Sequence, residues 1–234
     1  MTELELRQKV AAKIVTWIGL KASDRSNQII LNLYNDHKPL ARGYAIKQGD
    51  AWCAATVSAV AIYLHLTDIM PTEVSCPQMI ALYQQHKLSR WEENDNYIPK
   101  IGDIIMYDWQ DSGSGDNKGT ADHVGIVTNV NGSTITVTEG NMGGVVGQRT
   151  LQIGGKYIRG YCLPNYSWKA AQSQQSEPQI AYPDRWQTIN DVPDGYYRQQ
   201  VKRLMDRGVI AGEDGKLDLT KDMLRTLLMA ERLK

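Results

Sequence analysis

A cysteine, a histidine and an acidic residue follow one another in this chain in settings typical of a nucleophile, its base and the group that orients the base. Cys53 opens an apolar run after Asp50, and His123 opens another. Glu139 and Asn141 close the run that follows. Cysteine-dependent acyl transfer uses a thiolate, an imidazole and a polar partner of this kind. We therefore predict Cys53, His123, Glu139 and Asn141 as catalytic residues.

The position of Cys53 favours its reactive form. A free thiol has a pKa of about 8.5, and a helix N-terminus or a nearby imidazole lowers that pKa. Asp50 is a candidate N-cap for a helix over residues 51–66, so Cys53 falls in its first turn. A lone cysteine in such an alanine-rich helix is more often a small buried hydrophobe. The histidine run downstream favours the catalytic interpretation.

The remaining histidines and cysteines give weaker signals. His37 lies in a polar turn, while His65 and His86 fall on helices and read as surface or core residues. The chain has 3 cysteines and no C-x-x-C spacing, which argues against a disulfide framework or a thiolate zinc site. Cys76 and Cys162 are predicted to be small buried hydrophobes.

The turn after the His123 strand decides whether the three groups meet. A two-residue turn at Asn131 and Gly132 pairs residue 123 with 140 and puts Glu139 on the opposite face. A three-residue loop, or one bulge, pairs 123 with 141 and brings His123, Glu139 and Asn141 together. The two-residue turn gives the cleaner amphipathic hairpin. We choose the other register because His123 otherwise lacks an orienting group.

Two further segments could hold ligands, and both lack the required spacing. Residues 108–116 carry several aspartates and glycines but no EF-hand pattern, which favours a solvated loop. Residues 140–147 are rich in glycine but lack a phosphate-loop motif. We predict no metal site and no cofactor.

The pattern of apolar residues predicts an α+β protein. Helical spacing covers residues 3–20, 27–34, 51–66 and 76–87, and strand-like runs cover 104–107, 123–130, 135–139 and 156–162. Helices followed by strands indicate helices packed on an antiparallel sheet. We predict a catalytic domain over residues 1–165, a polar linker over 166–182 and a small helical module over 183–234. In that module we expect a helix over 194–207 and a final helix capped by Thr220.

Composition narrows the range of partners. The 234 residues carry 26 basic and 26 acidic side chains, and this balance argues against nucleic acid as a partner. No apolar stretch approaches the roughly 20 residues of a membrane span. The charged N-terminus lacks the apolar core of a signal peptide, so synthesis in a cytoplasm without a signal peptide is expected.

Four runs together resemble the CHAP family, the cysteine, histidine-dependent amidohydrolases and peptidases. They contain Trp52-Cys53-Ala54-Ala55, residues 99–105, residues 123–127 and Glu139-Gly140-Asn141, in the family's order. The resemblance covers roughly residues 20–165. It implies a papain-like fold and hydrolysis of amide bonds in bacterial peptidoglycan. It also implies Cys53 as nucleophile, His123 as base, Glu139 as orienter and Asn141 as a supporting group.

The C-terminal residues 192–225 resemble one repeat of a surface-layer-homology module, which implies attachment to cell-wall glycan. Together the two resemblances indicate a phage or prophage endolysin that acts on the wall after release. The alternatives are an injected or secreted toxin with the same chemistry and a non-catalytic wall-binding protein. The sequence leaves open whether the enzyme is an amidase or an endopeptidase. The C-terminal module is expected to expose an apolar stripe (Val201, Leu204, Leu224, Leu227, Leu228), which makes a homo-oligomer possible.

Overall fold

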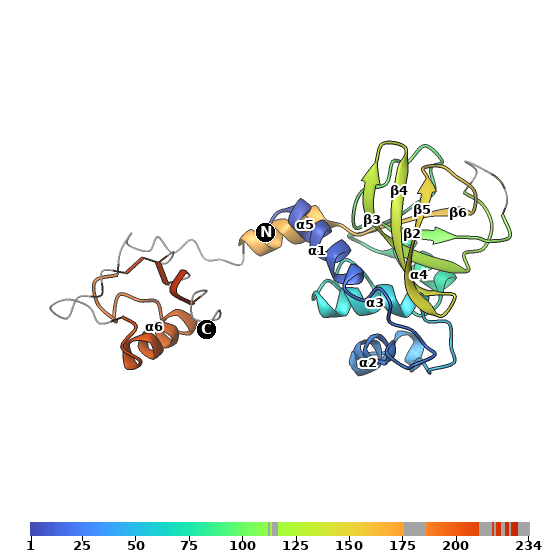
Figure 1. Cartoon of the computed structure of the whole chain (residues 1–234). Coiled ribbons are helices and arrows are strands. Elements are labelled where there is room, and N and C mark those ends of the chain that lie inside the picture. Colours follow the sequence, from blue (N-terminus) through green and yellow to red (C-terminus); the bar gives the residue numbers. More distant parts are fainter. Residues whose placement is uncertain are drawn as a thin grey trace. The chain divides into compact units, whose positions relative to one another are not determined.

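The computed structural model describes residues 1–111, 113, 117–175, 186–210, 217, 219–220, 223–224 and 226–228. The chain forms two compact units, Met1–Glu177 and Pro178–Lys234 (Figure 1). The boundary falls inside the range that the sequence predicts as a linker.

The first unit contains several helices, and one of them is buried along most of its length. The helices are α1 (Glu3–Val15), α2 (Gln28–Asp36), the short 3-10 helix η1 (Ala41–Gly43), α3 (Cys53–Tyr63), α4 (Cys76–Gln85) and α5 (Tyr166–Gln175). Residues 53–61 of α3 are all buried, which agrees with their small and apolar side chains. The predicted cap is wrong, because Trp52 is the N-cap and makes no side-chain cap. The Asp50 carboxylate accepts the backbone N–H of Lys47 and closes the preceding turn instead.

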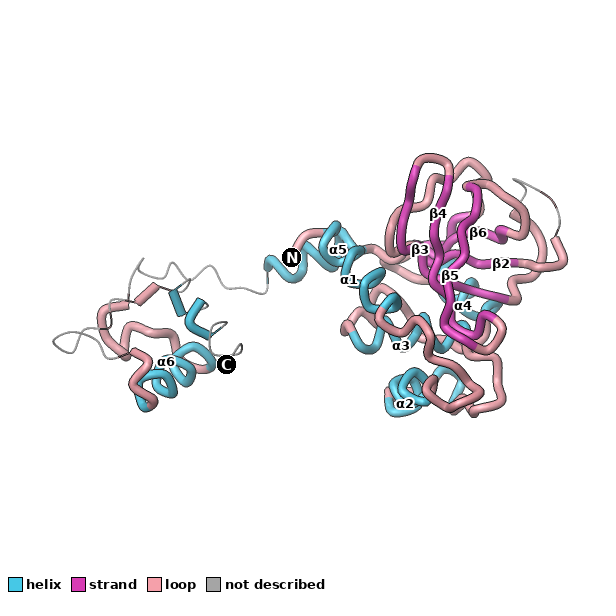
Figure 2. Tube along the Cα trace, in the orientation of Figure 1, coloured by secondary structure: helices cyan, strands magenta, loops and turns pink. Residues whose placement is uncertain are grey.

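The described part of the first unit also contains an antiparallel sheet of six strands (Figure 2). The strands are β1 (Arg90–Glu92), β2 (Ile104–Tyr107), β3 (His123–Asn131), β4 (Thr134–Met142), β5 (Val145–Gln152) and β6 (Ile158–Leu163). Their order is β1-β6-β2-β3-β4-β5, and every neighbouring pair is antiparallel. The predicted α+β class is confirmed. Strands β1 and β5 were not predicted.

Both faces of the sheet are covered by apolar side chains. On one face, α1 and α3 pack against β3 and β4. The core on this face includes Ile104, Met106, Val124 and Ile126. The opposite face carries a second core that includes Ile105, Tyr107, Val127, Ile135 and Val137. Alternation along each strand therefore sends neighbouring residues into different cores.

The polar segment after residue 165 begins as a helix rather than a linker. Tyr166 and Ala170 are buried in the core of the first unit, and α5 packs against α1. The Tyr166 hydroxyl donates to the carbonyl of Gly102 at 2.7 Å, and the Arg7 guanidinium lies over its ring. Buried contacts of this kind outweigh the low hydrophobicity of the segment. The linker prediction is wrong for residues 166–175, and residues 176–182 lie outside the described part.

The second unit has an apolar core of its own. This unit contains helix α6 (Tyr196–Asp206) and an antiparallel bridge between Trp186 and Leu219. The Thr220 hydroxyl accepts the backbone N–H of Met223, which confirms the predicted cap. The predicted exposure of the apolar stripe is wrong. Val201, Leu204 and Leu224 are buried against Trp186 and Val192, and Leu227 and Leu228 are partly buried there.

Among the described residues, no helix combines the length and apolarity that crossing a membrane requires.

Candidate active site

Cys53 is the first residue of α3, and its side chain is buried with 4 % of its surface exposed. The free N–H groups of a first helical turn carry partial positive charge, which favours a thiolate there. The fold therefore gives Cys53 the setting that its sequence position predicts.

His123 and Glu139 meet across the hairpin of β3 and β4. Ring nitrogen Nε2 of His123 lies 3.0 Å from Oε2 of Glu139, and the Glu139 side chain is fully buried. The same imidazole is close enough to Cys53 that each group shifts the pKa of the other. The fold thus brings the sulfur, the ring and the carboxylate close to one another.

One bulge sets the register that makes this contact possible. Asn131 pairs with Thr134, so the turn is the two-residue Gly132-Ser133. The register shifts at Thr128, and before it Ile126 pairs with Thr138. Extending that pairing to the start of β3 sets residue 123 opposite 141. The register chosen from sequence is therefore the observed one, reached through a bulge rather than through a longer loop.

Two glycines make room for the site. A Cβ on Gly125 would lie 2.6 Å from Cγ of Glu139, so the carboxylate side chain occupies the space that a larger residue would fill. A Cβ on Gly140 would lie 1.9 Å from Oγ1 of Thr56, on the first turn of α3. Gly140 therefore lets β4 approach the helix that carries Cys53.

Glu139 has a second cationic partner, Arg149 on β5. Nε of Arg149 donates to Oε1 at 2.6 Å and Nη2 donates to Oε2 at 2.8 Å. This fork geometry holds both oxygens of a carboxylate in one plane. Sequence reasoning missed Arg149 because β5 was not predicted and an isolated arginine carries no spacing signal.

Two aromatic rings form one wall of the site. Tyr107 and Trp109 stack with 4.8 Å between their centroids. Their rings lie 5.8 Å and 5.9 Å, respectively, from the His123 ring. This stack limits how far the imidazole can turn away from Glu139.

Cys76 is the second group that sequence reasoning missed. It begins α4, and its sulfur lies 3.8 Å from the sulfur of Cys53. The residue is buried, as predicted, but it packs against the candidate nucleophile and not only in the core. Its position after the loop at residues 64–75 gave no sequence signal for that contact.

The remaining predicted candidates are placed as follows. Asn141 is half-buried at the end of β4 and adopts a left-handed backbone, with φ of 57°. Asparagine tolerates that conformation better than most residues. Its side chain makes no hydrogen bond to the described residues, so it is near the site without joining the hydrogen-bonded chain. His86 accepts the backbone N–H groups of Leu88 and Ser89 and is structural.

Hydrogen bonds hold part of the loop over residues 108–116, which was predicted to be solvated. The Asp108 carboxylate accepts the N–H groups of Gln110 and Thr120, and Asp111 accepts that of Gly113. Residues 112 and 114–116 lie outside the described part. Within the part that the structure describes, no three His, Cys, Asp or Glu side chains gather as a set of metal ligands.

Electrostatics favour a charged sulfur–imidazole pair. The hydrogen bond from Cys76 and then that from His123 lower the pKa of Cys53 well below its usual value, against the effect of burial. Burial acts to lower the pKa of His123, but hydrogen bonds to Cys53 and Glu139 outweigh it and raise that pKa to about 9. Burial likewise opposes ionisation of Glu139, yet bonds to His123 and Arg149 lower its pKa.

A groove of about 430 Å³ runs beside the start of α3 and α4. Its lining includes Tyr44, Ala51 and Val74. Ala51 and Val74 stand two residues before Cys53 and Cys76 in the chain, but neither cysteine lines this groove.

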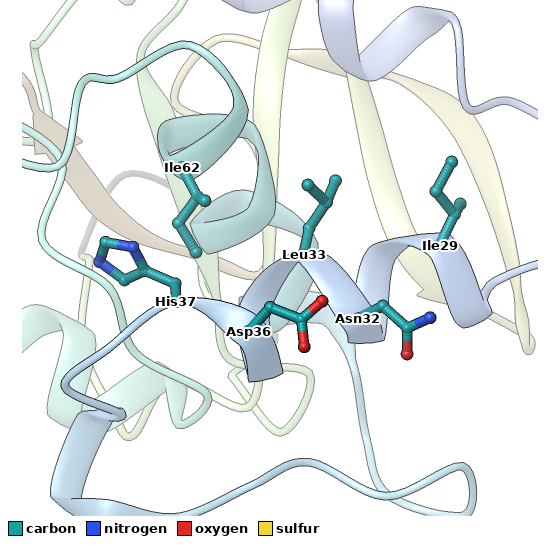
Figure 3. Close-up of a pocket in the computed structure, with 6 residues that line it drawn as sticks. All are labelled: Ile29, Asn32, Leu33, Asp36, His37 and Ile62. Carbon is teal, nitrogen blue, oxygen red and sulfur yellow. The ribbon is translucent and has the colours of Figure 1, made fainter.

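Another cavity, of about 620 Å³, lies between α2 and the C-terminal part of α3 (Figure 3). Ile29, Asn32, Leu33 and Asp36 project from α2 around it. Its lining also includes His37 but none of the four candidate catalytic residues. The candidate active site is therefore separate from this cavity.

Residues 44–141 match the family model of the CHAP domain. The matched range includes Cys53, His123, Glu139 and Asn141 but ends before Arg149. No curated protein and no solved structure matches the chain.

Proposed function

We propose that this protein hydrolyses amide bonds of bacterial peptidoglycan through a Cys53–His123–Glu139 mechanism. The observation that carries the proposal is the His123 ring hydrogen-bonded to a fully buried Glu139, together with the mutual pKa shifts of His123 and Cys53 at the start of α3. These three residues lie inside a region that matches the CHAP domain, which is typical of amidase and peptidase-type hydrolases of peptidoglycan.

The chemistry is acyl transfer. The Cys53 thiolate attacks the carbonyl carbon of the scissile amide, and backbone N–H groups at the start of α3 stabilise the developing oxyanion. His123, protonated in the resting site, donates its proton to the leaving amine as the carbon–nitrogen bond breaks. His123 then accepts one proton from water, which attacks the thioester and displaces the Cys53 thiolate. The carboxylic acid that is released gives its remaining proton to solvent. Glu139 orients the ring and stabilises its positive charge, with Asn141 in a supporting role.

The groove at the start of α3 and α4 is our candidate for binding an extended polar substrate. The exposed Tyr44 ring and the Arg42 guanidinium line it with two flat surfaces. The Tyr44 hydroxyl donates to Asp50, and Nε and Nη2 of Arg42 donate to Glu73. Such groups suit a peptide or sugar chain. We assign this groove to the substrate strand on one side of the scissile bond.

The second unit is proposed to attach the protein to the wall. Its resemblance to a surface-layer-homology repeat and its own apolar core support a separately folded binding module. With the catalytic chemistry, this favours a phage or prophage endolysin that is made in the host cytoplasm and reaches the wall at lysis.

Digestion of purified Gram-positive peptidoglycan tests the function. Mass spectrometry and amine labelling of the released fragments should reveal new amino termini. A free N-terminal alanine with an intact glycan identifies an amidase, and a free amine within the stem or crossbridge identifies an endopeptidase. New reducing sugar ends without new amines, or no new ends at all, would contradict the proposal.

A further inference from the structure

We infer that Arg149 is a positioning residue of the active site, which holds the Glu139 carboxylate in place and ionised so that it always accepts from His123. This inference rests on the proposed function. Arg149 lies on β5, outside the region that matches the CHAP domain.

The hydrogen-bond pattern carries the first step. Oε2 of Glu139 accepts from both Nη2 of Arg149, at 2.8 Å, and Nε2 of His123, at 3.0 Å. Oε1 accepts from Nε of Arg149 at 2.6 Å. The two arginine bonds leave the carboxylate no freedom to rotate about its last bond. The oxygen that faces His123 is therefore fixed by Arg149.

Strand pairing explains why Arg149 reaches this carboxylate. Val137 pairs with Arg149 and Glu139 pairs with Gly147, so Arg149 is the diagonal neighbour of Glu139 on the same sheet face. Gly147 has no side chain of its own at the position directly opposite Glu139. A long side chain two residues further along β5 can therefore lie across the carboxylate.

Arg149 is itself held by the aromatic wall. Its guanidinium carbon lies 4.6 Å from the Trp109 ring centroid and 5.6 Å from that of Tyr107. The same two rings flank His123. One stack thus supports both donors to Glu139, which keeps the arginine, the carboxylate and the imidazole in register.

The burial of Glu139 indicates a second role for Arg149, which is to keep the carboxylate ionised. Glu139 is fully buried, and a buried carboxylate protonates unless cations and donors compensate for the lost water. His123 alone supplies one hydrogen bond to the carboxylate. Without Arg149, Glu139 would take up a proton at a higher pH and could no longer stabilise the imidazolium.

The test compares Arg149→Met and Arg149→Lys with the wild type, using soluble peptidoglycan fragments. Arg149→Met should lower kcat by about 10²-fold with little change in KM, because a misplaced base slows chemistry more than binding. The acid limb of its pH profile should move to higher pH. Arg149→Lys keeps the positive charge but not the two-pronged hydrogen bonding, so its kcat and acid limb should lie between those of the wild type and Arg149→Met. Arg90→Met, which removes an exposed arginine on β1, is the matched control and should behave as wild type.

A double variant separates positioning from general stability. If Arg149 acts through Glu139, then Glu139→Gln with Arg149→Met should have the same kcat as Glu139→Gln alone. Multiplicative losses in the double variant, or an Arg149→Met enzyme with wild-type kcat and acid limb, would overturn the inference. A lowered melting temperature with unchanged kcat would also overturn it, because Arg149 would then be structural only.

A failure of the proposed function is recognised separately. If the wild type releases no fragments from peptidoglycan, the proposed function fails, and the inference is then judged by alkylation of Cys53 with iodoacetamide. In Arg149→Met the acid limb of alkylation should still move to higher pH, since a protonated Glu139 leaves the His123–Cys53 pair less stabilised. If the acid limb of Cys53 alkylation in Arg149→Met stays at the wild-type pH, the inference is overturned.

Discussion

The charge state of Cys53 and His123 defines the pH range in which the site works. The pKa of Cys53 lies well below its usual value, and that of His123 is raised to about 9. Acylation requires a thiolate, which is present above the first pKa, and an imidazolium, which is present below the second. Under the proposed function, activity should therefore rise through the Cys53 pKa and fall as pH passes about 9.

Glu139→Gln tests this assignment. The amide cannot stabilise the imidazolium by charge, so the pKa of His123 should fall and the alkaline limb should move to lower pH by about one unit. The rate at the optimum should fall by about 10²-fold or more, as for other orienting carboxylates. Rates of soluble-fragment cleavage from pH 4 to 10 measure both effects. An alkaline limb at the wild-type position in Glu139→Gln would contradict the role of Glu139.

Cys76 gives a second prediction at the residue scale. Its thiol remains protonated, because the hydrogen bond to Cys53 and burial raise its pKa well above the usual value, so it can donate to the Cys53 thiolate. Cys76→Ala removes this donor and should raise the pKa of Cys53. The pH midpoint of Cys53 alkylation should then move upward by about one unit.

Cys162→Ala is the control for that measurement, because Cys162 is buried on β6 in the helix-facing core. The pH midpoint of Cys53 alkylation in Cys162→Ala should match that of the wild type. If Cys76→Ala also matches, the contact between the two sulfurs has no influence on the nucleophile, and Cys76 is only the buried hydrophobe expected from sequence.

At the scale of elements, the close approach of β4 to α3 sets the distance between base and nucleophile. Gly140→Ala would drive a methyl group into Thr56, on α3. Overpacking of this kind costs about 1–3 kcal/mol of the free energy of unfolding. We expect that loss together with reduced kcat, because β4 carries Glu139 and must shift away from the helix.

Gly49→Ala is the matched control, since a Cβ there meets no atom within 4 Å. Its stability should stay within about 0.5 kcal/mol of the wild type. Chemical denaturation and fragment cleavage of both variants provide the comparison. A Gly140→Ala protein with unchanged stability and rate would show that strand β4 has room to move.

Sequence patterns predicted some elements of the site and not others, for physical reasons. The strands of His123 and Glu139 carry strong alternation, whereas β5 mixes glycine, glutamine and arginine and reads as a loop. Its strand structure comes from pairing with β4, which is tertiary and has no local signal. Arg149 was missed for the same reason. The sequence allowed either a longer loop or a bulge in this hairpin, and the pairing of β3 with β4 shows that the bulge, at Thr128, is present.

At the scale of the molecule, the two units have different tasks under the proposed function. The catalytic groups, the groove and α5 all belong to the first unit, and the second has its own core. A cut near Tyr166 would remove the buried Tyr166 and Ala170, so the first unit is better ended after Glu177. Sequence composition placed this boundary too early because α5 is polar.

Residues 1–177 alone should therefore fold and cleave soluble fragments with the kcat of the full chain. Binding to whole Gram-positive cells should fall by at least about tenfold, because the linked second site no longer adds to the first. Cell sedimentation and fragment cleavage measure the two properties. Undiminished cell binding by residues 1–177 would contradict wall attachment by the second unit.

The central claim is that Cys53 is the nucleophile of a peptidoglycan hydrolase, and the rate of wall digestion by Cys53→Ala tests it most directly. The full-length variant should lose at least about 10³-fold in rate, as expected when a nucleophile is removed. Its melting temperature should stay close to that of the wild type, because the change removes one sulfur atom. Cys162→Ala, treated in the same way, should digest walls at nearly the wild-type rate. Wild-type digestion by purified Cys53→Ala would contradict the account.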